Sequence, residues 1–291
     1  MKTINYGEKC DERVILLLGF FDCLHKGHLE LIKKARELRD VKHSKIALFT
    51  FKNDDFSQNG TLLCYNERIE KAERFGVDFI VAATFDESFK NTSYKDFFER
   101  LGATLNIDAI ICGFDYKFGK NAEGNAEILQ NLCEKKNIPV YVIPKTEAGG
   151  EKISTTRIKF LLENGKICEA NELLGEPYSI TGKVVKGRQI GREIGFPTAN
   201  INVPKHKFRI KCGVYKTHVL LGGVRYGAIT NYGARPTFDL DFVLTETFIK
   251  DFSDDLYGKV ITVFFDDYIR DIERFYDIEK LKEQLEKDKN V

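Results

Sequence analysis

The sequence predicts an α/β fold in two parts: a doubly wound parallel sheet, then a small antiparallel β-barrel domain with a C-terminal helix. In the first part, short apolar runs alternate with amphipathic stretches, which is typical of parallel strands connected by helices. In the second part, apolar residues alternate one by one, which is typical of antiparallel strands with one buried face. A length of 291 residues also favours two domains, which we place at 1–176 and 177–291.

The first part contains the stronger pattern. Strands are expected at 14–21, 45–51, 77–84, 108–113 and 139–143. Helices are expected between and after them, at 28–38, 66–75, 94–101, 125–136, 155–164 and 167–174. Ser93 and Asp96 have the spacing of a capping box, and Gly76 and Gly102 stand where helices end. Because parallel sheets bind ligands beyond the carboxyl ends of their strands, the loops there are the place to search for a site.

The second part reads as a barrel closed by a helix. Residues 215–221 alternate in character, and Gly222-Gly223 then offers a hairpin turn. Two more strands are expected at 242–252 and 259–265, and a helix at 277–287. The acidic segment 251–255 lacks the glycine and terminal glutamate of a calcium loop, so we interpret it as a hairpin turn.

The balance of charge excludes several kinds of partner. Lys and Arg number 45 against 44 Asp and Glu, divided as 26 and 27 in 1–175 and 19 and 17 in 176–291. Neither half has the basic surplus needed to neutralise many phosphates of a nucleic acid, whereas a small phosphorylated ligand remains open. The longest apolar run, 14–21, is far shorter than the ~20 residues that span a bilayer. We therefore expect neither nucleic-acid nor membrane binding, and self-association is left undecided.

The cysteines indicate a reducing compartment. Their number, 7, is odd, and they are scattered without a Cys-x-x-Cys pair. This favours free thiols over a disulfide framework or a zinc site. The run at 14–21 also follows several charged residues, unlike the core of a signal peptide. We expect a cytoplasmic protein.

The first predicted strand leads into a turn suited to phosphate. His25 and His28 are three residues apart where the next helix begins. Backbone N–H groups and the helix dipole favour an anion there, and Gly27 allows the backbone to come close to it. A single histidine is more often an ordinary surface or core residue, but two of them directly after the first strand favour a functional site.

A second helix start has the same character. Ser154, Thr155 and Thr156 supply three hydroxyls, and Arg157 adds a guanidinium. Taken alone, this is a generous N-cap. Together with the histidine turn, it predicts a polyphosphate held between two helix starts, with Arg157 as a bidentate donor.

The second half offers hard oxygen ligands. Thr198 and Asn200 place a hydroxyl and an amide oxygen two residues apart, as Mg²⁺ prefers, although an ordinary polar turn would look the same. The chain contains no Walker lysine motif, so a kinase here would hold ATP differently.

Glu246 has two interpretations. Strand alternation puts it on one face with Phe242, Leu244 and Phe248, where burial would suit it to act as a general base. The buried face could equally be the other one, which carries Val243, Thr245, Thr247 and Ile249. The pattern alone does not choose between them.

These motifs resemble a known enzyme family over essentially the whole chain. The first half is similar to nucleotidyltransferases in Gly19-Phe-Phe-Asp22-Cys-Leu-His25-Lys-Gly27-His28 and Ile153-Ser-Thr-Thr-Arg157, and to the FMN adenylyltransferase branch in Gly113-Phe-Asp115-Tyr-Lys-Phe118-Gly119-Lys-Asn-Ala-Glu-Gly124. The second half resembles riboflavin kinase in Gly182-Lys-Val-Val-Lys-Gly187, Gly195-Phe-Pro197-Thr198-Ala-Asn200, Gly233-Ala-Arg235-Pro-Thr237 and Leu256-Tyr257-Gly258-Lys. The chain is identified as a member of the bacterial bifunctional riboflavin kinase/FAD synthetase family.

The resemblance implies two ATP-dependent reactions with Mg²⁺. Riboflavin would be phosphorylated to FMN in the second domain, and FMN would be adenylylated to FAD with release of pyrophosphate in the first. In the first domain the resemblance implies that ATP is bound by eight residues: Gly19, Phe21, Asp22, His25, His28, Ser154, Thr155 and Arg157. It also implies that His28 is catalytic. It places Asp115 and Phe118 beside the flavin.

In the second domain the resemblance makes Glu246 the base that accepts the proton of the attacking hydroxyl. Thr198 and Asn200 would bind the metal, while Gly187, Gly195 and Thr198 would contact ATP. Arg270 is expected on the flavin side.

The first domain also departs from the family. A small residue is usual where Cys23 stands, asparagine is common where Phe20 stands, and residues 52–55 replace a Pro-His-Pro segment. One alternative is therefore a kinase with a weak or repurposed adenylyltransferase domain. Another is a non-catalytic flavin-binding regulator.

Overall fold

The computed structural model describes residues 1–57, 59–187, 191, 194–234 and 243–291. The chain forms two compact units, Met1–Thr155 and Thr156–Val291, and each is described by itself. In the described part of the chain, no helix combines the length and apolar character needed to span a membrane.

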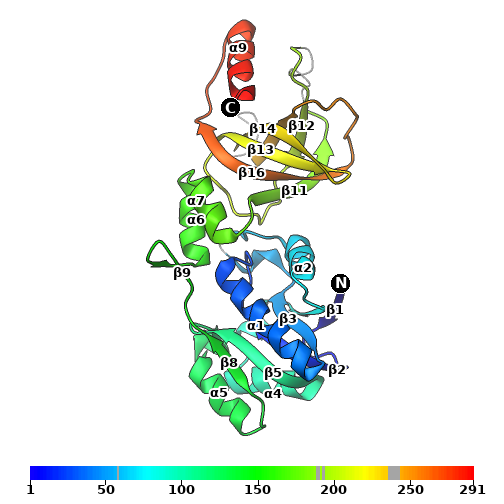
Figure 1. Ribbon diagram of the computed structural model, residues 1–291, viewed down its shortest axis with the longest axis vertical. Helices are drawn as coiled ribbons and strands as arrows, with labels where there is room; N and C mark the ends of the chain where they lie inside the picture. Colours follow the sequence, from blue (N-terminus) through cyan, green and yellow to red (C-terminus); the bar gives the residue numbers. More distant parts are fainter. Residues whose placement is uncertain (58, 188–190, 192–193, 235–242) are drawn as a thin grey trace. The chain divides into compact units, whose positions relative to one another are not determined.

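The first unit is built on a six-stranded sheet in the order β1-β4-β3-β2-β5-β8. Strands β2, β3, β5 and β8 are labelled in the blue-to-green part of Figure 1. Every neighbouring pair is parallel. The strands are β1 Lys2–Asn5, β2 Cys10–Leu18, β3 Lys45–Phe51, β4 Phe79–Ala83, β5 Leu105–Gly113 and β8 Val140–Ile143. The parallel sheet predicted from the apolar runs is confirmed. The sequence pattern missed β1, because only Ile4 of its four residues is buried.

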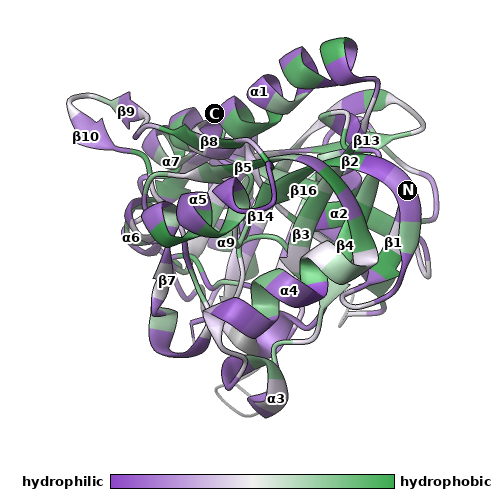
Figure 2. Ribbon diagram, turned by 90° about the horizontal axis from the view of Figure 1, so that it is seen from below, coloured by the Kyte–Doolittle hydropathy of each residue, from purple (hydrophilic) through white to green (hydrophobic). Residues whose placement is uncertain are grey.

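Helices cover both faces of this sheet, as expected for a doubly wound fold. Ile15 and Leu17 of β2 pack with helices α1 and α2, whereas Leu16 and Leu18 pack with α4 and α5. The helices are α1 Lys26–Lys42, α2 Tyr65–Arg74, α4 Tyr94–Thr104 and α5 Ala126–Glu134. The mixed colouring along α1 and α5 in Figure 2 reflects one face turned to the sheet and one to solvent.

Short elements connect these layers, and the sequence pattern did not predict them. They are η1 Asp54–Phe56, α3 Glu87–Lys90, η2 Lys120–Ala122, the pair β6 Lys117–Phe118 and β7 Gly124–Asn125, and the pair β9 Glu147–Ala148 and β10 Glu151–Lys152. Two helices then follow, α6 Thr155–Glu163 and α7 Ile167–Leu174, near their predicted positions.

The second unit contains a closed barrel in the order β11-β12-β15-β14-β13-β16, confirming the predicted architecture. Its strands are β11 Tyr178–Val185, β12 Thr198–Asn202, β13 Gly213–Leu221, β14 Val224–Ala234, β15 Val243–Ile249 and β16 Val260–Arg270. Helix α7 packs on the barrel through Asn171, whose Nδ2 donates to the Phe265 carbonyl oxygen at 2.8 Å. Helix α9, Ile278–Lys289, follows the last strand.

Two turn predictions had different outcomes. Gly222 and Gly223 have φ of 58° and 82° and join the paired strands β13 and β14, as a two-residue hairpin requires. The hairpin expected at 251–255 was wrong, because β15 and β16 are not neighbours in the barrel. A local pattern of turn residues does not reveal which strands pair.

Candidate active sites

The turn after β2 is tightly built. Phe21 and Leu24 are completely buried, yet both have left-handed φ angles, 50° and 48°. Such backbone costs of order 1–3 kcal/mol and persists only where the surroundings hold it. At Gly19, a Cβ atom would lie 3.0 Å from the Phe21 ring, so a larger residue would require that buried ring to shift. The packing of this turn thus fixes the backbone conformation that precedes the first residue of α1.

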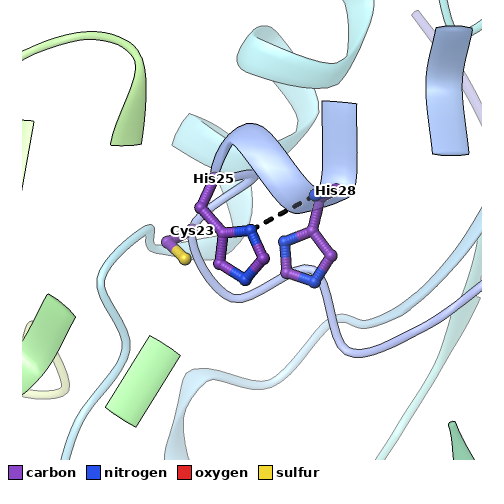
Figure 3. A group of neighbouring side chains, drawn as sticks. All are labelled: Cys23, His25 and His28. Atoms are coloured by element: carbon purple, nitrogen blue, oxygen red, sulfur yellow. Dashed lines mark hydrogen bonds between the residues drawn. The ribbon is translucent and has the colours of Figure 1, made fainter. Parts of the chain in front are cut away.

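His25 and His28 meet at the N-terminus of α1. His25 is the N-cap, and its Nδ1 accepts the backbone N–H of His28 at 3.2 Å. The two imidazoles are stacked, with centroids 3.8 Å apart and planes 10° apart (Figure 3). At Gly27, a Cβ atom would lie 3.0 Å from the His25 ring. A larger residue at position 27 would therefore require the His25 ring to shift slightly.

Both imidazoles are electrically neutral at pH 7. Burial lowers the pKa of His25 to about 4, opposed in part by its own backbone hydrogen bond. Burial also lowers the pKa of His28 well below its usual range, and His25 and Lys71 lower it further. The Lys71 ammonium group is itself buried and donates to the Cys23 carbonyl oxygen at 3.0 Å. His28 Nδ1 is shielded from solvent and has no hydrogen-bond partner among the described residues.

The depressed pKa of His25 predicts a dependence of stability on pH. In the unfolded chain the His25 imidazole binds a proton below about pH 6.5, whereas in the folded state it binds one only below about pH 4. Because the unfolded state binds more protons between these values, lowering the pH destabilises the fold. Between pH 7 and pH 5, this histidine removes about 2 kcal/mol of unfolding free energy. His25→Asn, which keeps an N-cap side chain, should lose that part of the pH dependence. Urea unfolding of the wild-type and His25→Asn proteins at pH 7 and pH 5 measures the free energy of unfolding. If both proteins lost the same amount between the two pH values, His25 would not be the source of the loss.

The other predicted residues of this site occupy distinct positions. Asp22 is buried, and its Oδ1 accepts the Leu62 backbone N–H at 2.8 Å, so this carboxylate also holds the turn. Thr155 Oγ1 lies 3.5 Å from Cys23 Sγ, which brings the start of α6 to the histidine turn, and Ser154 precedes it. Arg157 is the third residue of α6 and belongs to the second unit.

An aromatic cavity of about 500 Å³ lies beside the turn, with Gly19 and Phe118 in its wall. Phe118 stacks on Tyr116 with centroids 5.4 Å apart. The other rings in the wall are those of Phe20, Phe49, Phe51, Phe85, Phe89 and Phe97. Asp115 does not line this cavity and forms an ion pair with Lys152. The cavity is suited to a flat, largely apolar ring system.

The barrel has a second cavity, of about 360 Å³, formed by β12, β15 and residues 252–257. Thr198 and Asn200 both line it. Gly187 covers Asn200, because a Cβ atom there would lie 2.4 Å from the Asn200 Nδ2. Asn200 is 4% exposed, and its Oδ1 has no partner among the described residues. Gly195 is exposed, with a left-handed φ of 87°.

The structure decides the orientation of Glu246. The buried face of β15 carries Val243, Thr245, Thr247 and Ile249, so the second of the two interpretations is correct. Inside the barrel, Thr247 Oγ1 lies 2.9 Å from Thr230 Oγ1. Glu246 lies on the other face, is half-buried and does not line the barrel cavity. The expected burial of Glu246 among apolar side chains is met only in part, since Leu244 on its face is 3% exposed whereas Glu246 itself is half-buried.

Glu246 instead stands in a row of polar residues across three strands. It pairs with Asn200 of β12 on one side and Asn231 of β14 on the other. Directly paired residues share a face, so the carboxylate lies between two carboxamides. Asn231 Oδ1 is also buried and without a partner among the described residues. Sequence reasoning missed Asn231, because only the register of the strands brings it to this row.

Arg270 lies elsewhere in the second unit. Its guanidinium makes two hydrogen bonds to the carboxylate of Asp288, at 3.0 Å and 2.7 Å, which raise its pKa. These bonds attach α9 to the end of β16. The part of the kinase-like motif at 235–237 lies outside the described residues.

Comparison with known proteins identifies both units. A family model described as FAD synthetase matches residues 7–157, and one described as riboflavin kinase matches 174–291. Curated proteins named bifunctional riboflavin kinase/FMN adenylyltransferase match nearly the whole length of this chain. That of Listeria monocytogenes is 32% identical over 98% of this chain and 93% of the relative. That of Haemophilus influenzae is 33% identical over 94% and 91%.

A solved structure has the same fold. It is described as a macrolide-efflux protein from Streptococcus pneumoniae, with a TM-score of 0.89 and 32% identity over 99% of this chain and 98% of that chain. The full-length matches to curated enzymes and the two family models agree with the division of the chain into two units. The chain belongs to the bifunctional riboflavin kinase/FMN adenylyltransferase family.

Proposed function

We propose that this enzyme makes FAD from riboflavin in two steps, one in each domain. Residues 177–291 transfer the γ-phosphoryl group of ATP to riboflavin, giving FMN. Residues 1–176 join AMP from a second ATP to FMN and release pyrophosphate. One observation carries this proposal: the first unit matches the family model for one reaction and the second unit the family model for the other.

In adenylyl transfer, an FMN phosphate oxygen forms a bond to the α-phosphorus of ATP as the bond to the pyrophosphate oxygen breaks. Such transfers depend on positioning and on stabilising charge on phosphate oxygens. His25 and His28 are neutral, so each imidazole can donate one hydrogen bond to the triphosphate, assisted by the dipole of α1. We assign ATP binding also to Gly19, Phe21, Asp22, Ser154, Thr155 and Arg157. The aromatic cavity with Phe118 would take the flavin ring, with Asp115 near its polar end.

In the kinase reaction, Glu246 accepts the proton of the riboflavin hydroxyl as that oxygen forms a bond to the γ-phosphorus and the bond to the leaving ADP oxygen breaks. Thr198 and Asn200 would hold Mg²⁺. The buried, unpartnered Asn200 Oδ1 supports this, since it is the hard oxygen ligand that Mg²⁺ prefers. The ion would neutralise charge on the transferred phosphate. Gly187 and Gly195 would let backbone approach the phosphates, and Arg270, held by Asp288, is assigned to the flavin side.

The test uses the purified protein with riboflavin, MgATP and no other enzyme, with flavins followed by chromatography. We expect FMN to appear first and FAD to follow. FMN without FAD would leave a kinase with a repurposed first domain. Neither product would favour a flavin-binding regulator.

Asn231 supplies a sharper prediction within the kinase site. Asn231→Ala should slow riboflavin phosphorylation about tenfold or more, since it removes the carboxamide paired with Glu246, whose N–H group can donate to the carboxylate, and such a hydrogen bond to a charged group is worth about 1.5 kcal/mol. FAD formation from added FMN should not change. Asn202→Ala, an exposed residue at the end of β12, is the matched control. An unchanged kinase rate in Asn231→Ala would remove that residue from the site.

We also propose that the enzyme works in the cytoplasm, on small molecules, without a nucleic-acid or membrane partner. All seven cysteines are free thiols, which supports a reducing compartment.

A further inference from the structure

Three soft or borderline metal ligands converge at the histidine turn. Cys23 Sγ and one ring nitrogen each from His25 and His28 all lie within 4.8 Å of one another. Figure 3 shows the two imidazoles side by side, with Cys23 next to the His25 ring. Cys23 and His25 are buried, and His28 is partly buried. The spacing Cys-x-His-x-x-His has no paired cysteines, so its cysteine pattern alone did not indicate a metal site.

The chemistry of these donors fits zinc. Zn²⁺ binds thiolate and imidazole at about 2.3 Å and 2.1 Å, and three protein ligands leave a fourth position for water or substrate. In a tetrahedral site the donor atoms are separated by about 3.5 Å. The cluster therefore needs to contract by about 1 Å at its widest, and the two stacked imidazoles must tilt so that their nitrogen lone pairs meet at one ion. His28 Nδ1 is shielded from solvent and has no hydrogen-bond partner among the described residues, so this nitrogen is available to bind a ligand.

The surroundings in part favour and in part oppose such a site. Burial and the neighbouring Asp22 raise the pKa of the Cys23 thiol to about 12, so the ion itself must displace the thiol proton on binding. Cys23 Sγ lies 3.5 Å from the Thr155 hydroxyl and is also hydrogen-bonded to the His25 backbone, and a metal bond would replace the hydroxyl contact. Asp115 lies close enough to His25 to act on it electrostatically and offers compensating negative charge. The opposing charges are those of Lys71 and Lys152, and Lys152 is already paired with Asp115.

We propose that Cys23, His25 and His28 form a Zn²⁺-binding site that competes with ATP for the histidine turn. On binding, the Cys23 thiol forms a Zn–S bond and releases its proton to water, and each histidine gives a nitrogen lone pair to the ion. The inhibitory consequence rests on the proposed function, in which the same imidazoles bind the triphosphate. An enzyme with zinc bound would make FMN but not FAD.

Metal binding is tested without turnover. Co²⁺ replaces Zn²⁺ as a spectroscopic probe, in a protein whose exposed Cys168 and Cys212 are both changed to alanine. One equivalent should give a thiolate-to-cobalt absorption band that excess Zn²⁺ removes. Cys23→Ala should lose the band, whereas Cys64→Ser should keep it. A band that survives Cys23→Ala, or no band in the parent protein, would overturn the proposal; Cys23→Ser replaces Cys23→Ala if circular dichroism finds the latter unfolded.

The effect on catalysis is measured at buffered micromolar free Zn²⁺ with excess Mg²⁺. In the parent protein FAD formation should fall about tenfold or more, with a raised KM for ATP, while riboflavin phosphorylation is unchanged. Cys23→Ala should make FAD normally and lose most of this inhibition. Equal inhibition in both proteins would overturn competition at this site. If the metal-free protein makes no FAD at all, the proposed function fails, and the cobalt titration still decides whether the metal site exists.

Discussion

Glu246→Gln should lower the rate of riboflavin phosphorylation about 10²–10⁴-fold, the range that a general base contributes. The amide keeps the size of the side chain but cannot accept the proton of the attacking hydroxyl. FAD formation from added FMN should stay at the wild-type rate, because the histidine turn assigned to adenylyl transfer lies in the other unit. Both rates are read by chromatography of flavins from one preparation.

The matched control for Glu246 is Glu273→Gln, an exposed carboxylate outside the row of Asn200, Glu246 and Asn231. It should leave both rates unchanged. A Glu246→Gln protein that lost both activities would contradict the assignment of two sites. A Glu246→Gln protein that kept full kinase activity would show that Glu246 is not the general base.

His28→Ala should have the opposite selectivity. FAD formation should fall about 10²–10³-fold, as when one donor to a developing phosphate charge is removed. Riboflavin phosphorylation should not change. The two rates are measured separately, with FMN or riboflavin as the flavin substrate.

The control for His28 is at the other end of the same helix. His43 is exposed and caps α1 with a left-handed φ of 52°, which asparagine tolerates, so His43→Asn should leave both reactions intact. His28→Asn serves if the alanine variant folds poorly. Undiminished FAD synthesis in a folded His28 variant would exclude this imidazole from the site.

Much of the fold could be predicted from local pattern. Strand β3 runs over Lys45–Phe51 and helix α7 over Ile167–Leu174, the predicted limits in both cases. Each combines a continuous or periodic apolar pattern with clear boundaries. The histidine turn was also visible, because a strand, a turn and a helix N-terminus are contiguous in sequence, and contiguous residues cannot be far apart.

The kinase site was visible only in part. Thr198 and Asn200 are neighbours in sequence, but the residues around Glu246 come from three strands. Strand alternation tells which residues share a face, not which face is buried, and for β15 both faces contain apolar side chains. The place of Asn231 beside Glu246 likewise depends on strand pairing, and the bond between Arg270 and Asp288 joins residues that are distant in sequence. Neither contact can be read from the local sequence.

By itself the sequence determined the fold class, the two-part organisation and the histidine turn at the first helix start, because these follow from periodicity and from residues adjacent in the chain. The tertiary structure alone decided that Glu246 lies between two carboxamides on the outer face of the barrel, and that the side chains of Cys23, His25 and His28, close in sequence, point toward one another. Those arrangements arise from strand register, ring packing and burial. They are set by the balance of many distant contacts, which no local pattern of residues encodes.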